Sequence, residues 1–157
     1  ETKLLDVGAY PGGWSQVSSK IITSGKILSL DLKKMDQIKN VSFLQSNFLE
    51  ENTKEKVFNF FSGSLNVVLS DMAADTTGNK SLDCIRTNQL CANVINFSSK
   101  ILLPNGVLIS KLFMGDDFLE VKDLAKSKFK KVQFFKPEAS RNESKETYLY
   151  CAILKTL

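Results

Sequence analysis

The sequence predicts one α/β domain with a doubly wound, mostly parallel sheet of about seven strands and helices on both faces. Short apolar runs of strand length alternate along the chain with segments whose apolar residues recur at helical spacing. Asn66–Ser70 is a continuous apolar run that ends at Asp71, which is typical of a strand buried on both faces of a parallel sheet. With 157 residues and 43% hydrophobic side chains, the chain is long enough to bury one core.

The first part of the chain indicates a strand, a glycine turn, a helix and two more strands. The strand expected at Lys3–Val7 runs into a turn over Gly8–Gly13. The apolar face of the helix that follows is expected to consist of Trp14, Val17, Ile21 and Ile22. Two further strands are expected at Lys26–Leu30 and Val41–Leu44.

The second part continues the alternation after the strand that ends at Asp71. The polar stretch Ala74–Asp83 is expected to be a loop that borders a pocket, because active sites of this architecture lie at the carboxyl ends of the strands. A turn at Pro104–Gly106 is expected to follow one predicted helix and to precede a strand, and a second helix after that strand is expected to be capped by Asp116 or Asp117. The apolar residues of these helices are Leu90, Cys91, Val94, Ile95, Ile101 and Leu102, and then Phe118, Val121, Leu124, Ala125 and Phe129. The remaining strands are expected at Val107–Lys111, Lys131–Phe135 and Tyr148–Leu154.

The composition excludes several kinds of chemistry. The chain has no histidine, so Ser-His-Asp and Cys-His catalysis are excluded within it, and the commonest transition-metal ligand is missing. Cys84, Cys91 and Cys151 are odd in number and lie among apolar neighbours, which favours reduced core thiols over disulfides or a zinc site. The net charge of +4 is compatible with a phosphate-backbone partner but is also common for a solvated surface.

The sequence gives only limited information about where in the cell the protein is located. No apolar stretch approaches the roughly 20 residues that cross a bilayer, so no membrane association is expected. The chain starts at Glu1 without a methionine, and we expect it to be an excised piece of a longer protein. An intracellular location is expected, either the cytoplasm or, for a eukaryotic source, an organelle such as a mitochondrion or plastid.

The glycine turn after the first strand points to a bound small molecule. Glycines let the backbone approach a ligand closely, because a side chain there would block the approach. The spacing differs from the dinucleotide fingerprint G-x-G-x-x-G, since its second glycine would fall at Tyr10 and a proline follows. This spacing disfavours a nicotinamide-dependent oxidoreductase. The structural alternative is a tight turn that binds no ligand. Asp31 ends the second strand, where a carboxylate can accept from a ribose diol, cap a helix or lie in a solvated turn.

Six motifs, taken in order, carry a resemblance to a known family. They are Asp6–Gln16, Asp31–Asp36, Phe43–Phe48, Leu69–Ala73, Ser110–Phe113 and Lys136–Tyr148. In this order they resemble the successive motifs of the FtsJ/RrmJ RNA ribose 2′-O-methyltransferases, and the resemblance spans nearly the whole chain. It implies the Rossmann-like fold of S-adenosylmethionine-dependent methyltransferases and an enzyme that methylates the 2′-oxygen of an RNA ribose.

The resemblance implies S-adenosyl-L-methionine as the cofactor. The residues expected to bind it are Gly8, Pro11, Gly12, Gly13, Trp14, Asp31, Leu32, Asn47, Phe48 and Asp71. The glycine turn and Trp14 would line its methionine side, Asp31 would hold the ribose hydroxyls, and Asp71 would lie beside the sulfonium. Asn47 stands where the family usually has Asp, and its amide oxygen can still accept from the adenine amino group.

The resemblance also implies a catalytic set of the order Lys-Asp-Lys-Glu, of which Asp71, Lys111 and Glu146 match the last three. Lys111 is the candidate that deprotonates or positions the ribose hydroxyl, because a nearby cation can lower a lysine pKa from about 10.4 toward neutrality. The first lysine belongs, in the family, to a helix before the first strand, so we expect that this chain lacks that N-terminal helical segment. Lys3 lies too close to the first strand to replace it.

Two of the catalytic candidates also have a purely structural interpretation. Lys111 would then be a strand-end lysine reaching solvent, and Glu146 a surface carboxylate paired with Lys145 or Arg141. A module that senses the cofactor or binds RNA without catalysing is the corresponding alternative for the whole protein. Under these alternatives the protein would not transfer a methyl group, whereas the predicted enzyme would.

The partners implied by the resemblance are RNA and the cofactor, with no metal required. Large-subunit ribosomal RNA, free or in the ribosomal subunit, is the substrate most suggested, while an mRNA cap or a tRNA ribose are rivals within the same chemistry. The residues expected to contact phosphates are Lys80, Arg86, Lys136, Arg141 and Lys145. We expect residues 1–157 to form a single catalytic domain that is a monomer.

Overall fold

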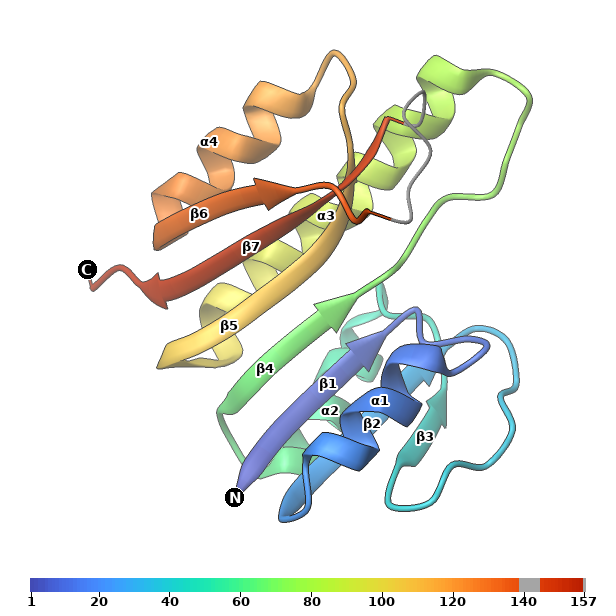
Figure 1. The fold of residues 1–157 in the computed structure, drawn as a ribbon, viewed down its shortest axis with the longest axis vertical. Coiled ribbons are helices and arrows are strands. Elements are labelled where there is room, and N and C mark those ends of the chain that lie inside the picture. The colour runs from blue at the N-terminus through green and yellow to red at the C-terminus, as the bar shows by residue number, and fades with distance from the viewer. Residues whose placement is uncertain (139–144, 157) are drawn as a thin grey trace.

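The protein folds around one seven-stranded sheet (Figure 1). The structure is a computed structural model that describes residues 1–138 and 145–156. The strands are β1 (Thr2–Val7), β2 (Gly25–Asp31), β3 (Ser42–Gln45), β4 (Leu65–Ser70), β5 (Leu102–Phe113), β6 (Phe129–Phe135) and β7 (Glu146–Leu154). Their order is β3-β2-β1-β4-β5-β7-β6, and β7 runs antiparallel to both of its neighbours while the other pairs are parallel. The predicted mostly parallel α/β sheet is confirmed.

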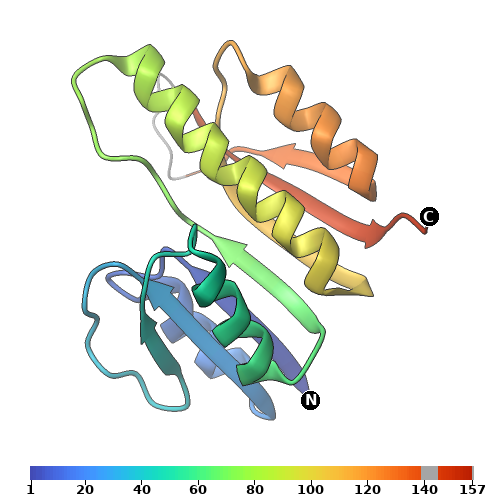
Figure 2. The same cartoon turned by 180° about the vertical axis from the view of Figure 1, so that it is seen from behind.

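Helices pack on both faces of this sheet, as predicted. In the described residues they are α1 (Gly13–Ile21), α2 (Glu51–Phe61), α3 (Lys80–Ile101) and α4 (Phe118–Lys128). The α1 helix lies on the face seen in Figure 1, and α2, α3 and α4 cover the opposite face, which Figure 2 shows. None of these described helices is long and apolar enough to cross a membrane.

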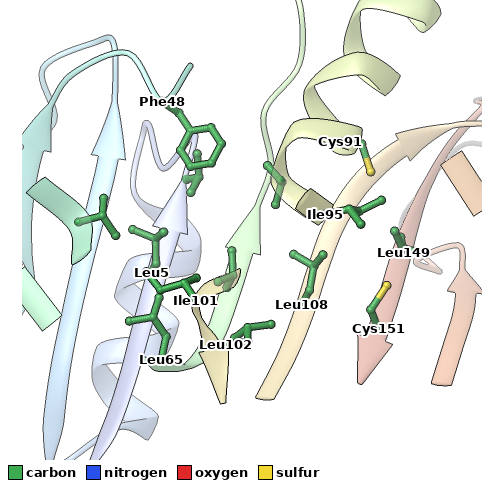
Figure 3. Packing of buried hydrophobic residues seen from close by; sticks show 14 of the residues in the cluster. Leu5, Phe48, Leu65, Cys91, Ile95, Ile101, Leu102, Leu108, Leu149 and Cys151 are labelled. Carbon is green, nitrogen blue, oxygen red and sulfur yellow. The ribbon is translucent and has the colours of Figure 1, made fainter. Parts of the chain in front are cut away.

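The hydrophobic core lies between the sheet and the three helices on one face. Leu5 and Val68 from the central strands are fully buried, as are Leu108 and Leu149 on the neighbouring strands. Helix α3 contributes Ile95 and other side chains to the same cluster, part of which Figure 3 shows. Burying these side chains removes apolar surface from water, which is the main favourable term in folding.

The predicted apolar face of α1 is wrong. Val17 and Ile21 are 58% and 74% exposed, whereas the residues that α1 buries are Ser15 and Ser18. Small serines let the helix approach the sheet closely, and the Ser15 hydroxyl donates to buried Asp6 on β1. A polar contact therefore positions α1 where the helical periodicity predicted an apolar one.

Helix α2 was not predicted from the sequence. Its buried residues Thr53, Val57 and Phe61 recur every four positions, which is a helical signal, but Asn and Lys residues between them weaken the pattern. The side chains of Lys3 and Lys26 donate to the carbonyl oxygens of Phe61 and Phe60 at the end of this helix, at 2.8 and 3.3 Å. Cations at a helix C-terminus satisfy its free carbonyls and complement its dipole.

Two boundaries in the second half differ from expectation. Helix α3 begins at Lys80, and the side chain of its N-cap residue Asn79 accepts from the backbone N–H of Leu82, so the predicted loop is shorter than expected. The predicted turn at Pro104–Gly106 lies inside β5, where the pairing with β4 shifts register. Asp117 is the N-cap residue of α4, but its carboxylate accepts from the Asn88 amide and makes no side-chain capping bond.

Candidate active site

Three strands bring Asp71, Lys111 and Glu146 together at one edge of the sheet. Asp71 follows the end of β4, and Lys111 lies near the end of the neighbouring β5. Glu146 begins β7, which runs in the opposite direction, so its first residue lies at the edge where the parallel strands end. The Lys111 Nζ lies 3.2 Å from Asp71 Oδ1 and 3.5 Å from Glu146 Oε2.

This charged cluster is partly shielded from water. The Lys111 side chain is 14% exposed, against 35% for Asp71 and 30% for Glu146. Lys111 therefore does not extend into solvent in the way a surface strand-end lysine would, and Glu146 contacts it directly. Reduced solvent screening strengthens the electrostatic interactions of such a cluster relative to exposed ion pairs.

Tyr148 is a member of this cluster that the sequence reasoning left without a role. Its hydroxyl lies 3.0 Å from Asp71 Oδ1, to which it donates, and 3.4 Å from Glu146 Oε1. Burial raises the pKa of the phenol well above its usual range, and the two neighbouring carboxylates raise it further. Tyr148 thus stays a hydrogen-bond donor and holds the two carboxylates on either side of Lys111. Its position two residues after Glu146, on the same face of a strand, was the available signal.

A buried polar network lies beneath the glycine turn. The Asp6 carboxylate is fully buried and accepts from the Ser15 hydroxyl at 2.6 Å, while Ser15 also contacts the Ser29 hydroxyl. Burial raises the pKa of Asp6 from 3.8 to about 6, and the hydrogen bond from Ser15 partly opposes that rise. Among the described residues, Asp6 Oδ1 has no hydrogen-bond partner. This network joins β1, β2 and α1 under the turn that follows β1.

A cavity of about 400 Å³ opens at the carboxyl ends of the central strands. Of the residues predicted to bind a cofactor, those that line it are Gly8, Asp31, Leu32, Asn47, Phe48 and Asp71. Gly8 has a φ of +69°, and a Cβ there would lie 2.8 Å from Met72 Cγ, so any side chain would be strained and crowded. The loop after β4 contributes Ala73 and Asp75 to the lining, as expected of a loop that borders a pocket.

Asp31 and Asn47 each use their side-chain oxygens to shape this cavity. The Asp31 carboxylate accepts from the backbone N–H groups of Tyr10 and Lys33, at 2.9 and 2.8 Å, so it ties the glycine turn to the end of β2. No helix begins next to it in the described residues 32–50, so the helix-cap alternative is wrong. Asn47 Oδ1 accepts from the backbone N–H of Leu49 at 3.0 Å. Each of these oxygens retains a second lone pair for a ligand hydroxyl or amino group.

The other predicted cofactor residues do not line this cavity, namely Pro11, Gly12, Gly13 and Trp14. Gly12 has a φ of +118°, and a Cβ there would lie 2.9 Å from Ile38 Cδ1, so the loop that follows β2 accounts for this glycine. Trp14 packs its ring against Tyr148, with 5.5 Å between ring centroids. Trp14 therefore lies next to the charged cluster rather than in the wall of the cavity.

A second cavity, of about 440 Å³, lies between α2 and α3 on the opposite face of the sheet. Its lining includes Lys54, Phe58, Phe97 and Lys100, and it contains no residue of the charged cluster. Among the described residues, no group of three or more histidine, cysteine or acidic side chains could hold a metal ion. The lining of this second cavity is therefore a mixture of apolar and charged side chains.

The cations proposed to contact phosphates lie on the surface, and one of them falls outside the described residues. Lys80 and Arg86 are exposed on the first turns of α3, and Lys136 and Lys145 are exposed next to β6 and β7. Arg141 lies outside the part of the chain that the structure describes. Lys3 does not belong to the charged cluster: its Nζ donates to the carbonyl oxygen of Phe61 at the other end of β1.

Solved structures with the same fold define the class of this protein. The chain superposes on a crystal structure described as a ribosomal RNA methyltransferase from Plasmodium falciparum with a TM-score of 0.85 and 28% identity, covering 98% of this chain and 87% of that one. It superposes on human methyltransferase-like protein 13, solved in complex with SAH, with a TM-score of 0.71 and 17% identity, covering 97% and 72%. The fold is that of a Rossmann-like methyltransferase.

Sequence comparison identifies the family within that class. The model of the FtsJ-like methyltransferase family matches residues 1–154. Two relatives named ribosomal RNA large subunit methyltransferase E are 42% identical over 152 residues, from Pelagibacter ubique, and 46% identical over 153 residues, from Rickettsia akari. The matches cover 97% and 94% of this chain and 75% and 67% of the relatives. The chain belongs to the FtsJ-like methyltransferase family, as its motifs predicted.

Proposed function

We propose that this protein is an S-adenosylmethionine-dependent RNA ribose 2′-O-methyltransferase that acts on large-subunit ribosomal RNA. One observation carries the proposal, namely that Asp71 belongs both to the cavity wall and to the charged cluster. A methyl donor in the cavity and an acceptor at Lys111 would therefore meet at Asp71. Placing both reactants beside one another is the main requirement of a transfer reaction.

The cavity supports S-adenosylmethionine as the donor. Its volume of about 400 Å³ is within the usual range for small-molecule pockets. In the proposal Gly8 lets the backbone approach the ligand, Asp31 accepts from ribose hydroxyls, and Asn47 with Phe48 borders the adenine. The ionised cluster has two carboxylates and one ammonium, so it leaves one negative charge to face a cation such as a sulfonium. When bound, the sulfonium supplies the activated methyl group.

The chain's own residues would prepare the acceptor. Lys111 Nζ is the group proposed to orient the ribose 2′-hydroxyl as an ammonium or, after it has lost its own proton, to take up the proton of that hydroxyl. The two carboxylates within 3.5 Å hold its side chain in place. Tyr148 donates to Asp71 and keeps that carboxylate oriented. The incomplete exposure of the three charged side chains limits competition from water.

The names of the relatives support ribosomal RNA as the substrate. Both curated relatives are named for the large subunit, and they share 42% and 46% of their aligned residues with this chain. The exposed cations Lys80, Arg86, Lys136 and Lys145 are proposed to hold the phosphates. We further propose that residues 1–157 form one catalytic domain, since a single buried cluster joins both halves of the sheet.

The first experiment measures binding and then transfer in the same preparation. Calorimetry gives the affinity for S-adenosylmethionine, and a tritiated methyl group reports transfer to total ribosomal RNA. Alkaline hydrolysis followed by mass spectrometry identifies the product, because a 2′-O-methyl group resists the alkaline cleavage that a free 2′-hydroxyl permits. The assay is run with and without whatever residues the gene encodes upstream of Glu1.

Two variants decide the outcome. Lys111→Met is expected to lower the transfer rate at least about a hundredfold while the protein still binds the cofactor, since it removes the group that acts on the ribose hydroxyl. Lys126→Met, on the exposed end of α4, is the matched control and is expected to retain the full rate. Absence of cofactor binding in every form of the protein, or methyl incorporation only at bases, would refute the proposal.

A further inference from the structure

Four side chains form a straight row across adjacent strands at the active-site edge of the sheet. Tyr148 on β7 pairs with Lys111 on β5 and, on its other side, with Phe135 on β6. Asp71 continues the row beyond Lys111, because Ser70 and Ser110 are paired immediately before them. Directly paired residues of neighbouring strands point to the same face. The row therefore runs from the charged cluster to the aromatic ring of Phe135.

The rings in this row are stacked against one another. The Phe135 and Tyr148 centroids lie 5.7 Å apart with 23° between the ring planes. The Trp14 ring, from α1, lies 5.5 Å from Tyr148 with the planes tilted by 49°. Tyr148 is nearly buried between its neighbours, at 9% exposure, and Trp14 is half-buried. Phe135 ends this series with 45% of its surface exposed.

The exposed ring lies on a part of the sheet that no described helix covers. The α1 helix packs over β1 and β2, and the remaining helices lie on the opposite face (Figures 1 and 2). Sheet faces usually bury a phenylalanine of this kind against another element. An aromatic ring that stacks on a neighbouring ring and is partly exposed is also the feature with which proteins bind single-stranded RNA bases.

Exposed lysines lie near this ring along the chain. Lys136 follows it directly and Lys145 precedes Glu146 at the start of β7, and both are exposed. Further along the same face, Lys131 Nζ lies 5.7 Å from the centroid of the Tyr150 ring. Aromatic rings interleaved with lysines, in a groove that follows a phosphate backbone, are typical of single-strand binding surfaces.

We propose that Phe135 is a stacking surface for a nucleobase of the RNA whose ribose lies at Lys111. Two strand spacings, about 10 Å, separate Lys111 from Phe135, so the base of the reacting nucleotide or of its neighbour can reach the ring. Lys136 and Lys145 lie where they can hold the adjoining phosphates. The inference rests on the proposed function for the identity of the reacting ribose, whereas base stacking is tested by binding alone.

The test uses a base that reports its own stacking. The probe is a short single-stranded oligouridylate with one 2-aminopurine, whose fluorescence is quenched when the base stacks on an aromatic ring. Wild-type protein is expected to quench it, and Phe135→Leu is expected to weaken binding at least about fivefold and to remove most of the quenching. Phe135→Trp is expected to retain or tighten binding, because it keeps the aromatic surface. Melting temperatures of the variants show that the fold is intact.

Two controls separate stacking from other causes. Phe58→Leu changes a phenylalanine of similar exposure, 55%, on α2 at the opposite face, and it is expected to leave binding unchanged. An oligonucleotide with an abasic site in place of 2-aminopurine should bind wild type and Phe135→Leu equally. Wild-type affinity in Phe135→Leu, or an equal loss for the abasic probe, would overturn the inference. Stacking without methyl transfer in any assay would instead refute only the proposed function.

Discussion

Replacing the buried carboxylate of Asp6 tests the polar network under the glycine turn. The folded-state pKa of about 6 lies above the ordinary 3.8, so the native state binds the proton more tightly than the unfolded chain. The stabilisation by the protonated carboxyl is fully present below about pH 4 and is lost as the pH rises through about 6. The difference of roughly two pKa units corresponds to about 3 kcal/mol over the whole window, and to about 2 kcal/mol between pH 4.5 and 7.

Asp6→Asn removes the titrating group while it keeps the size of the side chain. We expect the free energy of unfolding of the variant, relative to wild type, to rise by about 2 kcal/mol from pH 4.5 to pH 7 and to level off above pH 7. Urea unfolding at a series of pH values measures this difference, and any constant cost of the amide cancels from it.

A second variant moves the same titration in a defined direction. The hydrogen bond from Ser15 lowers the pKa of Asp6, so Ser15→Ala is expected to shift the loss of stability to higher pH. If the free energies of unfolding of Asp6→Asn and wild type differ by the same amount at every pH, burial does not raise the pKa of Asp6 and the prediction is refuted.

Three further predictions concern the cluster, the cavity and the thiols. Tyr148→Phe removes the hydroxyl that donates to Asp71 and lies 3.4 Å from Glu146, and we expect about a tenfold lower rate of methyl transfer with unchanged cofactor affinity and an altered pH–rate profile. Gly8→Ala forces a Cβ to within 2.8 Å of a methionine side chain at a φ of +69°, and calorimetry should show at least about tenfold weaker cofactor binding. Burial raises the pKa of Cys91 to about 11 and of Cys151 to about 12, so a thiol reagent at pH 8 should label only Cys84 until the protein unfolds.

The sheet was predictable because each strand carries its own local signal. Short apolar runs predicted six of the seven strands to within two residues at each end, and for β4 the continuous run also predicted burial on both faces. The beginning and end of β5 were less predictable, since Pro104 and Gly106 indicate a turn in the sequence and yet lie inside the strand. The shift of register against β4 accommodates these residues, and register is a property of two strands together.

The helices were predicted less well, because their contacts with the sheet decide which face is buried. Val17 and Ile21 gave α1 an apolar side that turns to solvent, while a hydrogen bond between Ser15 and Asp6 sets its orientation. No periodicity of hydrophobic residues reveals such a bond. Helix α2 has a buried stripe of only three residues among polar neighbours, which is too weak a pattern to identify alone.

For the candidate site, the family motifs predicted well which residues lie near one another. They predicted less well which neighbours each side chain contacts. Asp71, Lys111 and Glu146 meet within 3.5 Å, and their catalytic roles stay a prediction. Trp14 packs on Tyr148 at the cluster, and its predicted contact with a cofactor stays a prediction. A motif records that a residue is near the site, whereas the direction of its side chain depends on packing against elements distant in sequence.

The antiparallel strand β7 explains why the cluster forms at this edge. In a wholly parallel sheet only the residues after each strand reach the carboxyl edge, as Asp71 does. Because β7 runs the other way between β5 and β6, its first residue, Glu146, lies at that edge next to Lys111. Alternation along the strand then brings Tyr148 to the same face, where its hydroxyl reaches both carboxylates. The antiparallel strand β7 thus supplies the carboxylate of Glu146 and the hydrogen-bond donor of Tyr148. Through its pairing with β6 it also supports the exposed ring of Phe135.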